Sequence, residues 1–179
     1  MVIIRPVRKL YGSLPLSSDT RLTSTTALGD WYVKRIVVDR HPLLILVSST
    51  SLLTILTLAR DVRGLPGRLA ELVASRLKRY GIDQQLIDAE RNAMSSVAIA
   101  PTADRSVIGI MIEIGKVLPL YLEIGAWDET TLPSVEAQLA RTPWHAGRRD
   151  SEVVWPDRAI RTLLKDLWSA AHDLHVSDP

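Results

Sequence analysis

Cysteine is missing from this chain of 179 residues, and so is phenylalanine. Without a thiol there is no disulfide framework, no cysteine nucleophile and no cysteine-ligated zinc or iron–sulfur centre. Histidine is scarce, with four in the whole sequence, so catalysis by imidazole has few candidates. No glycine-rich loop of the kind that binds nucleotide phosphates is present either. These absences exclude several classes of enzyme before any residue is placed in space.

Long apolar runs are missing as well. A membrane span needs about 20 predominantly apolar residues, and the longest such stretch, residues 43–59, is broken by the polar run 48–51. Residues 107–127 are interrupted by charged side chains and a proline. Arg5 and Pro6 follow the first four residues too early for a secretory signal to form. We therefore expect a cytoplasmic protein that makes no membrane contact.

The charge is small overall but unevenly distributed. The net charge is +2, yet residues 1–80 carry 13 Lys and Arg against 5 Asp and Glu, whereas residues 81–179 carry 9 against 15. A basic half is typical of proteins that bind nucleic acid or another acidic partner. Alternatively, the two halves pack together and neutralise each other, within one chain or between two copies.

The N-terminal third has the pattern of a β-sheet. Residues 2–4, 31–38 and 43–47 are rich in β-branched and aliphatic side chains. Residues 39–42 separate two of these runs and predict a hairpin turn. Residues 52–58 fit either a third strand of the same meander or a short helix.

Helices dominate the rest of the chain. Apolar side chains recur at helical spacing over residues 65–80, with Pro66 near the start and Gly81 just beyond the end, where each favours a helix terminus. Arg76 falls within this apolar arc, which predicts an ion pair with an acidic residue of the second half. Asp83 is the expected N-cap of a second helix, and similar patterns predict two helices in the last third.

Residues 102–122 fit two structures. They form a helix that begins at Asp104 and is apolar nearly all round, which is typical of a central, buried helix. However, Ile110, Ile112 and Ile114 also alternate as in a strand. We favour the buried helix.

The fold class follows from these elements. With 46% hydrophobic and 23% charged residues, the composition excludes disorder as the main state, and the length predicts one domain. We expect a single α+β domain over residues 1–179, with an antiparallel sheet from the N-terminal half and helices packed on one face. Its expected parts are a mainly β region, two helices, a strand plus a buried helix, and C-terminal helices, at 1–60, 64–94, 97–124 and 133–175.

Four segments of the sequence resemble an uncharacterised family of small bacterial proteins, defined as a domain of unknown function. They are Gly-Asp-Trp-Tyr at 29–32, Asp-Arg at 39–40, the run 43–47 leading into Ser-Leu-Leu at 51–53, and Thr-Ala-Asp-Arg-Ser-Val-Ile-Gly at 102–109. In such proteins the last segment is similar to a strand end that leads into a helix. Where the family is expected to have asparagine before the Arg-Ser pair, this chain has Asp104. The resemblance covers about residues 1–120 and implies no assigned activity.

Arg105, Ser106 and Arg40 are candidate anion-binding or partner-binding residues. Arg105 and Ser106 lie where the helix is expected to begin, and free N–H groups with a guanidinium can hold a phosphate or carboxylate. Alternatively, Asp104 caps the helix and occupies the anion position itself. Arg40 lies at the tip of the expected hairpin, where turn chemistry alone also explains its neighbour Asp39.

Tryptophans are the other candidates for partner binding, because tryptophan is enriched among residues that dominate protein interfaces. Trp31 follows the Gly-Asp pair, and Trp144 shares a polar loop with Arg148 and Arg149. The alternative for each tryptophan is a place in the core. Trp144 is the favoured contact residue of the two.

Several arginines surround the first long helix and could follow a phosphate backbone. No helix-turn-helix, zinc-finger or ribonucleoprotein motif accompanies them. A solvated helix surface is the alternative. The nucleic-acid candidates are Arg60, Arg63, Arg68 and Arg79.

Taken together, these features predict a non-enzymatic bacterial interaction or regulatory protein, with an accessory role in a toxin–antitoxin or phage-defence module as one form. We expect a protein partner or a homo-oligomer, and no cofactor, metal or catalytic residue. One alternative is nucleic-acid binding by the basic half. The other is a small metal-dependent hydrolase or nuclease that uses scattered carboxylates such as Asp39 or Glu123. His172 and His175 lie three residues apart but have no evident third metal ligand.

Overall fold

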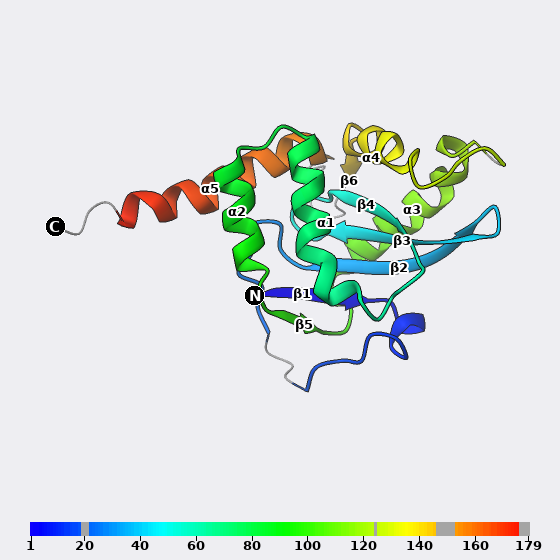
Figure 1. The fold of residues 1–179 in the computed structure, drawn as a ribbon, viewed down its shortest axis with the longest axis horizontal. Helices are drawn as coiled ribbons and strands as arrows, with labels where there is room; N and C mark the ends of the chain where they lie inside the picture. The colour runs from blue at the N-terminus through cyan, green and yellow to red at the C-terminus, as the bar shows by residue number, and fades with distance from the viewer. Residues whose placement is uncertain (19–21, 124, 146–152, 176–179) are drawn as a thin grey trace.

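A five-stranded sheet forms the centre of the protein (Figure 1). The computed structural model describes residues 1–18, 22–123, 125–145 and 153–175, with side chains described as far as residue 169. The strands lie in the order β4-β3-β2-β1-β5. Their bounds are Val2–Pro6 (β1), Trp31–Val38 (β2), His41–Ser48 (β3), Thr54–Leu58 (β4) and Val97–Ile99 (β5).

The sheet is mixed. β2, β3 and β4 form the antiparallel meander that the sequence predicts, so residues 52–58 contain a strand and not a helix. β1, in contrast, is parallel to both of its neighbours, with Ile4 opposite Trp31 of β2 and Val2 opposite Val97 of β5. The α+β class is confirmed, and the sheet combines parallel and antiparallel pairs.

The hairpin between β2 and β3 turns at two residues with left-handed backbone. Asp39 has φ 49° and Arg40 has φ 64°, and Val38 pairs with His41 across the turn. A two-residue hairpin turn with both central residues at positive φ matches the right-handed twist of the strands. Aspartate tolerates this conformation better than most side chains do.

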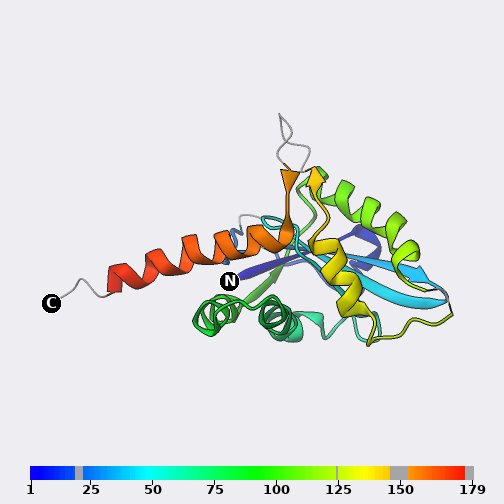
Figure 2. The same cartoon turned by 90° about the horizontal axis from the view of Figure 1, so that it is seen from above.

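The described residues form five α-helices around the sheet, and these cover both of its faces. Trp31 and Val33 of β2 belong to a core with the first two helices, whereas Tyr32 between them belongs to a second core with the next two. Figure 2 shows helices on the two sides of the strands. The expectation that helices pack on one face is therefore wrong. The helices are Leu65–Arg79 (α1), Gln84–Ala93 (α2), Arg105–Tyr121 (α3), Leu132–Ala140 (α4) and Pro156–His175 (α5).

Local sequence signals explain where these helices begin and end. The Asp83 side chain accepts a hydrogen bond from the Gln85 N–H at 2.8 Å, so the predicted cap of α2 is confirmed. Gly81 has φ 65° just after α1, the left-handed conformation in which glycine is favoured at helix ends.

The central position predicted for α3 is wrong. One side of the helix is buried against β2 and β3, but Ile112 is 43% exposed and Leu120 is 83% exposed. Within the described part of the chain, nothing covers this outer side. A helix that is apolar on all sides is usually buried on all sides, and the outer side of α3 is an exception.

The segment predicted as a loop after α4 contains a short strand pair. Trp144–His145 (β6) is antiparallel to Val153–Val154 (β7). Arg148 and Arg149, which the sequence also offers as candidate partner-binding residues, lie outside the described residues. Among the described residues, no helix is long and apolar enough to span a bilayer.

Glu136 is a buried carboxylate at the open edge of the sheet. It accepts hydrogen bonds from the N–H of Leu56 in β4 at 2.8 Å and from Arg76 Nε of α1 at 2.9 Å. Burial raises the pKa of Glu136, and the Arg76 guanidinium opposes that rise. The acidic partner predicted for Arg76 is thus confirmed, and one carboxylate joins α1, α4 and β4.

Glu90 is a second buried carboxylate, on α2. It accepts hydrogen bonds from the N–H groups of Ala27 and Leu28 at 2.9 and 3.0 Å and from Trp168 Nε1 of α5 at 2.9 Å. Burial raises the pKa of Glu90, whereas these hydrogen bonds lower it. Glu90 thereby connects α2, α5 and the segment that leads into β2.

Replacing Glu136 with alanine should lower the free energy of unfolding by about 3–5 kcal/mol, because it leaves the buried Arg76 without its partner. Urea denaturation measures this loss. The matched control is Glu129→Ala, since the Glu129 carboxylate is 58% exposed and 3.9 Å from Arg60; its effect should stay below about 1 kcal/mol. Equal losses in the two variants would contradict the role given to Glu136.

The stability of the protein should depend on the ionisation of Glu90. Because burial raises the folded-state pKa above the ordinary value of 4.5, the folded protein binds this proton more tightly than the unfolded chain does. As the pH falls through the raised pKa towards 4.5, the free energy of unfolding should therefore rise. Denaturation of wild type and Glu90→Gln over this range isolates the contribution, since Glu136 titrates in both proteins. A constant difference between the two would contradict it.

Candidate functional site

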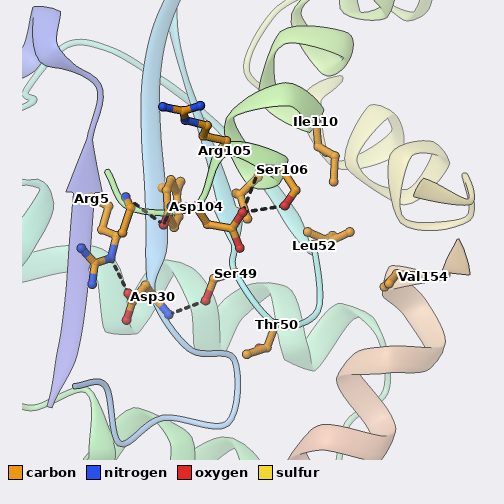
Figure 3. A pocket seen from close by; sticks show the side chains of 13 residues that line it. Arg5, Asp30, Ser49, Thr50, Leu52, Asp104, Arg105, Ser106, Ile110 and Val154 are labelled. Carbon is orange, nitrogen blue, oxygen red and sulfur yellow. Dashed lines mark hydrogen bonds and ion pairs between the residues drawn. The ribbon is translucent and has the colours of Figure 1, made fainter. Parts of the chain in front are cut away.

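A cleft of about 740 Å³ opens at the N-terminal end of α3 (Figure 3). Three segments far apart in the sequence meet there: the start of β2 at residues 30–32, the turn between β3 and β4 at 49–52, and the residues around the start of α3 at 103–107. All three segments contain residues of the motifs that resemble the bacterial family. The cleft is therefore the first candidate for a functional site.

An ion pair forms part of the cleft wall. Arg5 of β1 donates from Nε to the Asp30 carboxylate, and both side chains are mostly buried. Arg5 also donates to the Pro101 carbonyl oxygen at 2.6 Å, and the Asp30 N–H donates to Ser49 Oγ at 2.9 Å. These charged groups thus hold β1, β2 and the β3–β4 turn together.

Tyr32 fixes the start of α3. Its hydroxyl oxygen accepts hydrogen bonds from the N–H groups of Asp104 at 2.8 Å and Ala103 at 3.3 Å. Asp104 caps the helix, since its Oδ1 accepts from the Ser106 N–H at 2.8 Å and from the Ser106 hydroxyl at 2.6 Å. The carboxylate therefore occupies the place where an external anion would meet the helix.

Gly29 explains the glycine of the Gly-Asp-Trp-Tyr motif. Its φ is +69°, and a Cβ at this position would lie 2.5 Å from Ser49 Oγ. Both the left-handed backbone and the close approach of the β3–β4 turn favour glycine. The glycine of this motif is therefore explained by the backbone conformation and close packing that the cleft wall requires.

Arg105 lies exposed at the rim of the cleft (Figure 3). The structure shows no hydrogen bond or ion pair between its guanidinium and the described residues. Ser106 is half-buried, and its hydroxyl is engaged by Asp104. Of the two residues predicted to bind an anion or a partner here, Arg105 is the accessible one.

Trp31 and Trp144 do not offer contact surfaces. Trp31 is fully buried in the core between the sheet and α1. Trp144 is 9% exposed and donates from Nε1 to the Leu139 carbonyl oxygen at 3.2 Å. Both are core residues, so partner binding through either ring is wrong. Their places depend on the tertiary fold, which no local pattern of the sequence shows.

Arg40 is exposed at the hairpin tip, at the other end of β2 from the cleft. Its neighbour Asp39 accepts a hydrogen bond from the Gly125 N–H at 2.7 Å. The ring of His41 meets that of Trp127 edge-on, with centroids 5.3 Å apart. These contacts tie the hairpin tip to the segment after α3.

The four arginines predicted to bind nucleic acid differ in their contacts. Arg60 lies 3.9 Å from Glu129, and Arg79 lies 3.8 Å from Glu136. Arg68 donates to the Asp61 carbonyl oxygen at 2.6 Å, whereas Arg63 is exposed. Two of the four thus pair with acidic residues of the second half, as the alternative of internal neutralisation expects.

Sequence reasoning missed two features of the surface. The first is the exposed row along α3 formed by Gly109, Glu113, Lys116 and Leu120; two charged residues on one side of an otherwise apolar helix were the signal for it. The second is a cluster of arginines around the start of α5. The three-residue spacing of Arg158 and Arg161, which places both on one side of a helix, was the signal for this cluster.

In the part of the chain that the structure describes, no group of three His, Cys, Asp or Glu is placed to hold a metal ion. The His172 and His175 side chains lie outside that part.

The fold and the cleft define a mixed α+β domain whose family motifs meet around the start of one helix. A family model described as Domain of unknown function (DUF6933) matches residues 3–159, and the chain belongs to this family. The resemblance inferred from the sequence is confirmed. No curated protein and no solved structure matches the chain.

Replacing Tyr32 with phenylalanine should lower the free energy of unfolding by about 1–3 kcal/mol, because the N–H groups of Ala103 and Asp104 lose their acceptor. Hydrogen exchange should speed up at these two amides first. The control is Tyr121→Phe, whose phenol is exposed and has no hydrogen bond with the described residues. If both substitutions leave the start of α3 equally protected, Tyr32 does not fix it.

Proposed function

We propose that this protein is a non-enzymatic interaction protein that acts as a pair of copies joined along the outer row of α3. The observation that supports this is Leu120, a member of the row that is 83% exposed, with Ile112 on the same helix but outside the row 43% exposed. Exposed large apolar side chains on one helix face are typical of contact surfaces.

The outer row of α3 consists of Gly109, Glu113, Lys116 and Leu120. Spacings of four, three and four residues place these side chains along one side of a helix. Glu113 and Lys116 are more than half exposed, and Gly109 has open space around the position of a Cβ. A glycine inside a helix costs about 1 kcal/mol relative to alanine, and no contact among the described residues requires it at Gly109.

The row is complementary to itself. When two α3 helices run antiparallel with Glu113 of one opposite Lys116 of the other, the same register places Leu120 opposite Gly109. The large apolar side chain then meets the position without one, and opposite charges meet in the middle of the row. A surface that fits a second copy of itself about a twofold axis is what a symmetric dimer requires.

The expected dimer is weak, because a single helix pair buries less surface than a standard stable interface. Arg105 lies at one end of the same helix, so this arrangement brings the cleft of one copy near the C-terminal end of the partner's α3. An accessory role in a toxin–antitoxin or phage-defence module stays a prediction, and so do nucleic-acid binding and metal-dependent hydrolysis.

Sedimentation equilibrium tests the pairing. The wild-type chain should pass from monomer to dimer as its concentration rises to about 100 μM, and Leu120→Glu should remain monomeric. The control is Leu167→Glu, which places the same charge at a leucine that is 42% exposed on α5. A wild-type chain that stays monomeric over the whole range contradicts the proposal.

Charge reversal provides a sharper test of the register. Glu113→Lys and Lys116→Glu should each weaken self-association, because like charges then meet across the pair. An equal mixture of the two variants should form heterodimers, since every cross-contact again joins opposite charges. Loss of the ion pair within α3, 2.7 Å long in the monomer, affects both variants alike and cannot produce this rescue. No heterodimer in the mixture means that the row is not the interface.

A further inference from the structure

A second cavity, of about 300 Å³, lies where α1 ends, α4 passes and α5 begins. Figure 2 shows α4 beside the N-terminal part of α5. Four arginines from these elements line the cavity, together with Tyr80 and two carboxylates, Glu136 and Asp157. The arginines are Arg79, Arg141, Arg158 and Arg161.

The arginines of this cavity are only partly engaged. Arg141 is exposed, and the structure shows no hydrogen bond or ion pair between it and the described residues. Arg158 lies over the Trp155 ring, 5.0 Å from its centroid. Arg161 donates one N–H to the Tyr80 carbonyl oxygen at the end of α1. Most of the guanidinium donors around the cavity therefore remain available.

The two carboxylates do not neutralise the cavity. Glu136 is already held at 2.9 Å by Arg76, with Arg79 further away at 3.8 Å. Asp157 lies in the first turn of α5, where a helix terminus favours negative charge. Four arginines and two carboxylates therefore line the cavity, and Arg76 already pairs with one of the two carboxylates, so the lining carries an excess of positive charge.

We propose that this cavity binds a phosphate group. A phosphate carries up to two negative charges and several acceptor oxygens, so it can engage guanidinium groups from more than one helix at once. A carboxylate is satisfied by a single arginine fork. The volume of about 300 Å³ leaves room for a phosphate group and for part of the molecule that carries it.

The phosphate can belong to a small molecule or to a nucleic-acid backbone, and the cavity chemistry is the same for both. This site is separate from the outer row of α3, so its test is independent of the pairing proposed above. Arg141 and Arg158 are the residues to change, because Arg161 also supports the end of α1 through Tyr80.

Calorimetric titration of the full chain with inorganic pyrophosphate tests the site. We expect saturable binding at one site per chain that weakens as salt is added. Arg141→Gln and Arg158→Gln should each reduce the affinity about tenfold, as expected when a charge-assisted hydrogen bond is lost. The control, Arg63→Gln, removes an exposed arginine that does not line the cavity and should leave the affinity unchanged.

Tryptophan fluorescence gives a second measurement, because a ligand that draws Arg158 away from Trp155 changes the surroundings of that ring. The signal should disappear in Trp155→Phe while the calorimetric affinity persists. Displacement of pyrophosphate by a short oligothymidine identifies a nucleic-acid source, and failure to displace it identifies a small phosphate compound. No saturable binding of pyrophosphate, or binding that the Arg141 and Arg158 substitutions leave unchanged, overturns the proposal.

Discussion

Glu136 supplies a hydrogen-bond acceptor for the outermost strand of the sheet, β4. β4 has one free edge, and an edge N–H that finds no partner can pair with a strand of another molecule. The Leu56 N–H instead donates to Glu136 of α4, and the buried charge is stabilised by Arg76 of α1. Since a buried carboxylate is costly without such partners, α1 and α4 have to lie where they do. The arginine-lined cavity between α1, α4 and α5 is a consequence of that placement.

Glu90 on α2 is also a buried carboxylate, but it is stabilised by different partners. It has no arginine or lysine among its hydrogen-bond partners, which are two backbone N–H groups and the Trp168 indole. The three donors come from α5 and from the segment before β2. The carboxylate therefore connects α2 to two parts of the chain that are far apart in the sequence. Hydrogen bonds of this kind favour the ionised form, while burial opposes it. Burial also raises the pKa of Glu136, but there the Arg76 guanidinium opposes the rise, whereas at Glu90 backbone N–H groups and the Trp168 indole oppose it.

Local features of the fold could be predicted from the sequence, whereas features that depend on distant pairing could not. The cap of α2 at Asp83 and the turn after Val38 follow from neighbouring residues alone, and an arginine within an apolar arc implied the partner of Arg76. The parallel place of β1 depends on pairing with β5, over 90 residues away. The continuous apolar run of β3 was a signal that both faces of the sheet are covered, and treating it as one-sided led to the wrong placement of the helices. Trp31 and Trp144 were misplaced for the same reason, because burial of a large ring is decided by elements that meet only in the folded chain.

The sides of α3 serve separate purposes, and this separation connects the cleft to the proposed pairing. The inner side packs on β2 and β3, and the first turn is held by Tyr32 and capped by Asp104. With these contacts in place, the helix does not depend on its outer side for stability. The outer row can therefore carry Gly109, a residue of low helix propensity, and a leucine, Leu120, that is 83% exposed. A rigidly held helix also keeps its exposed residues in one fixed arrangement, so less ordering entropy is lost when a second copy binds.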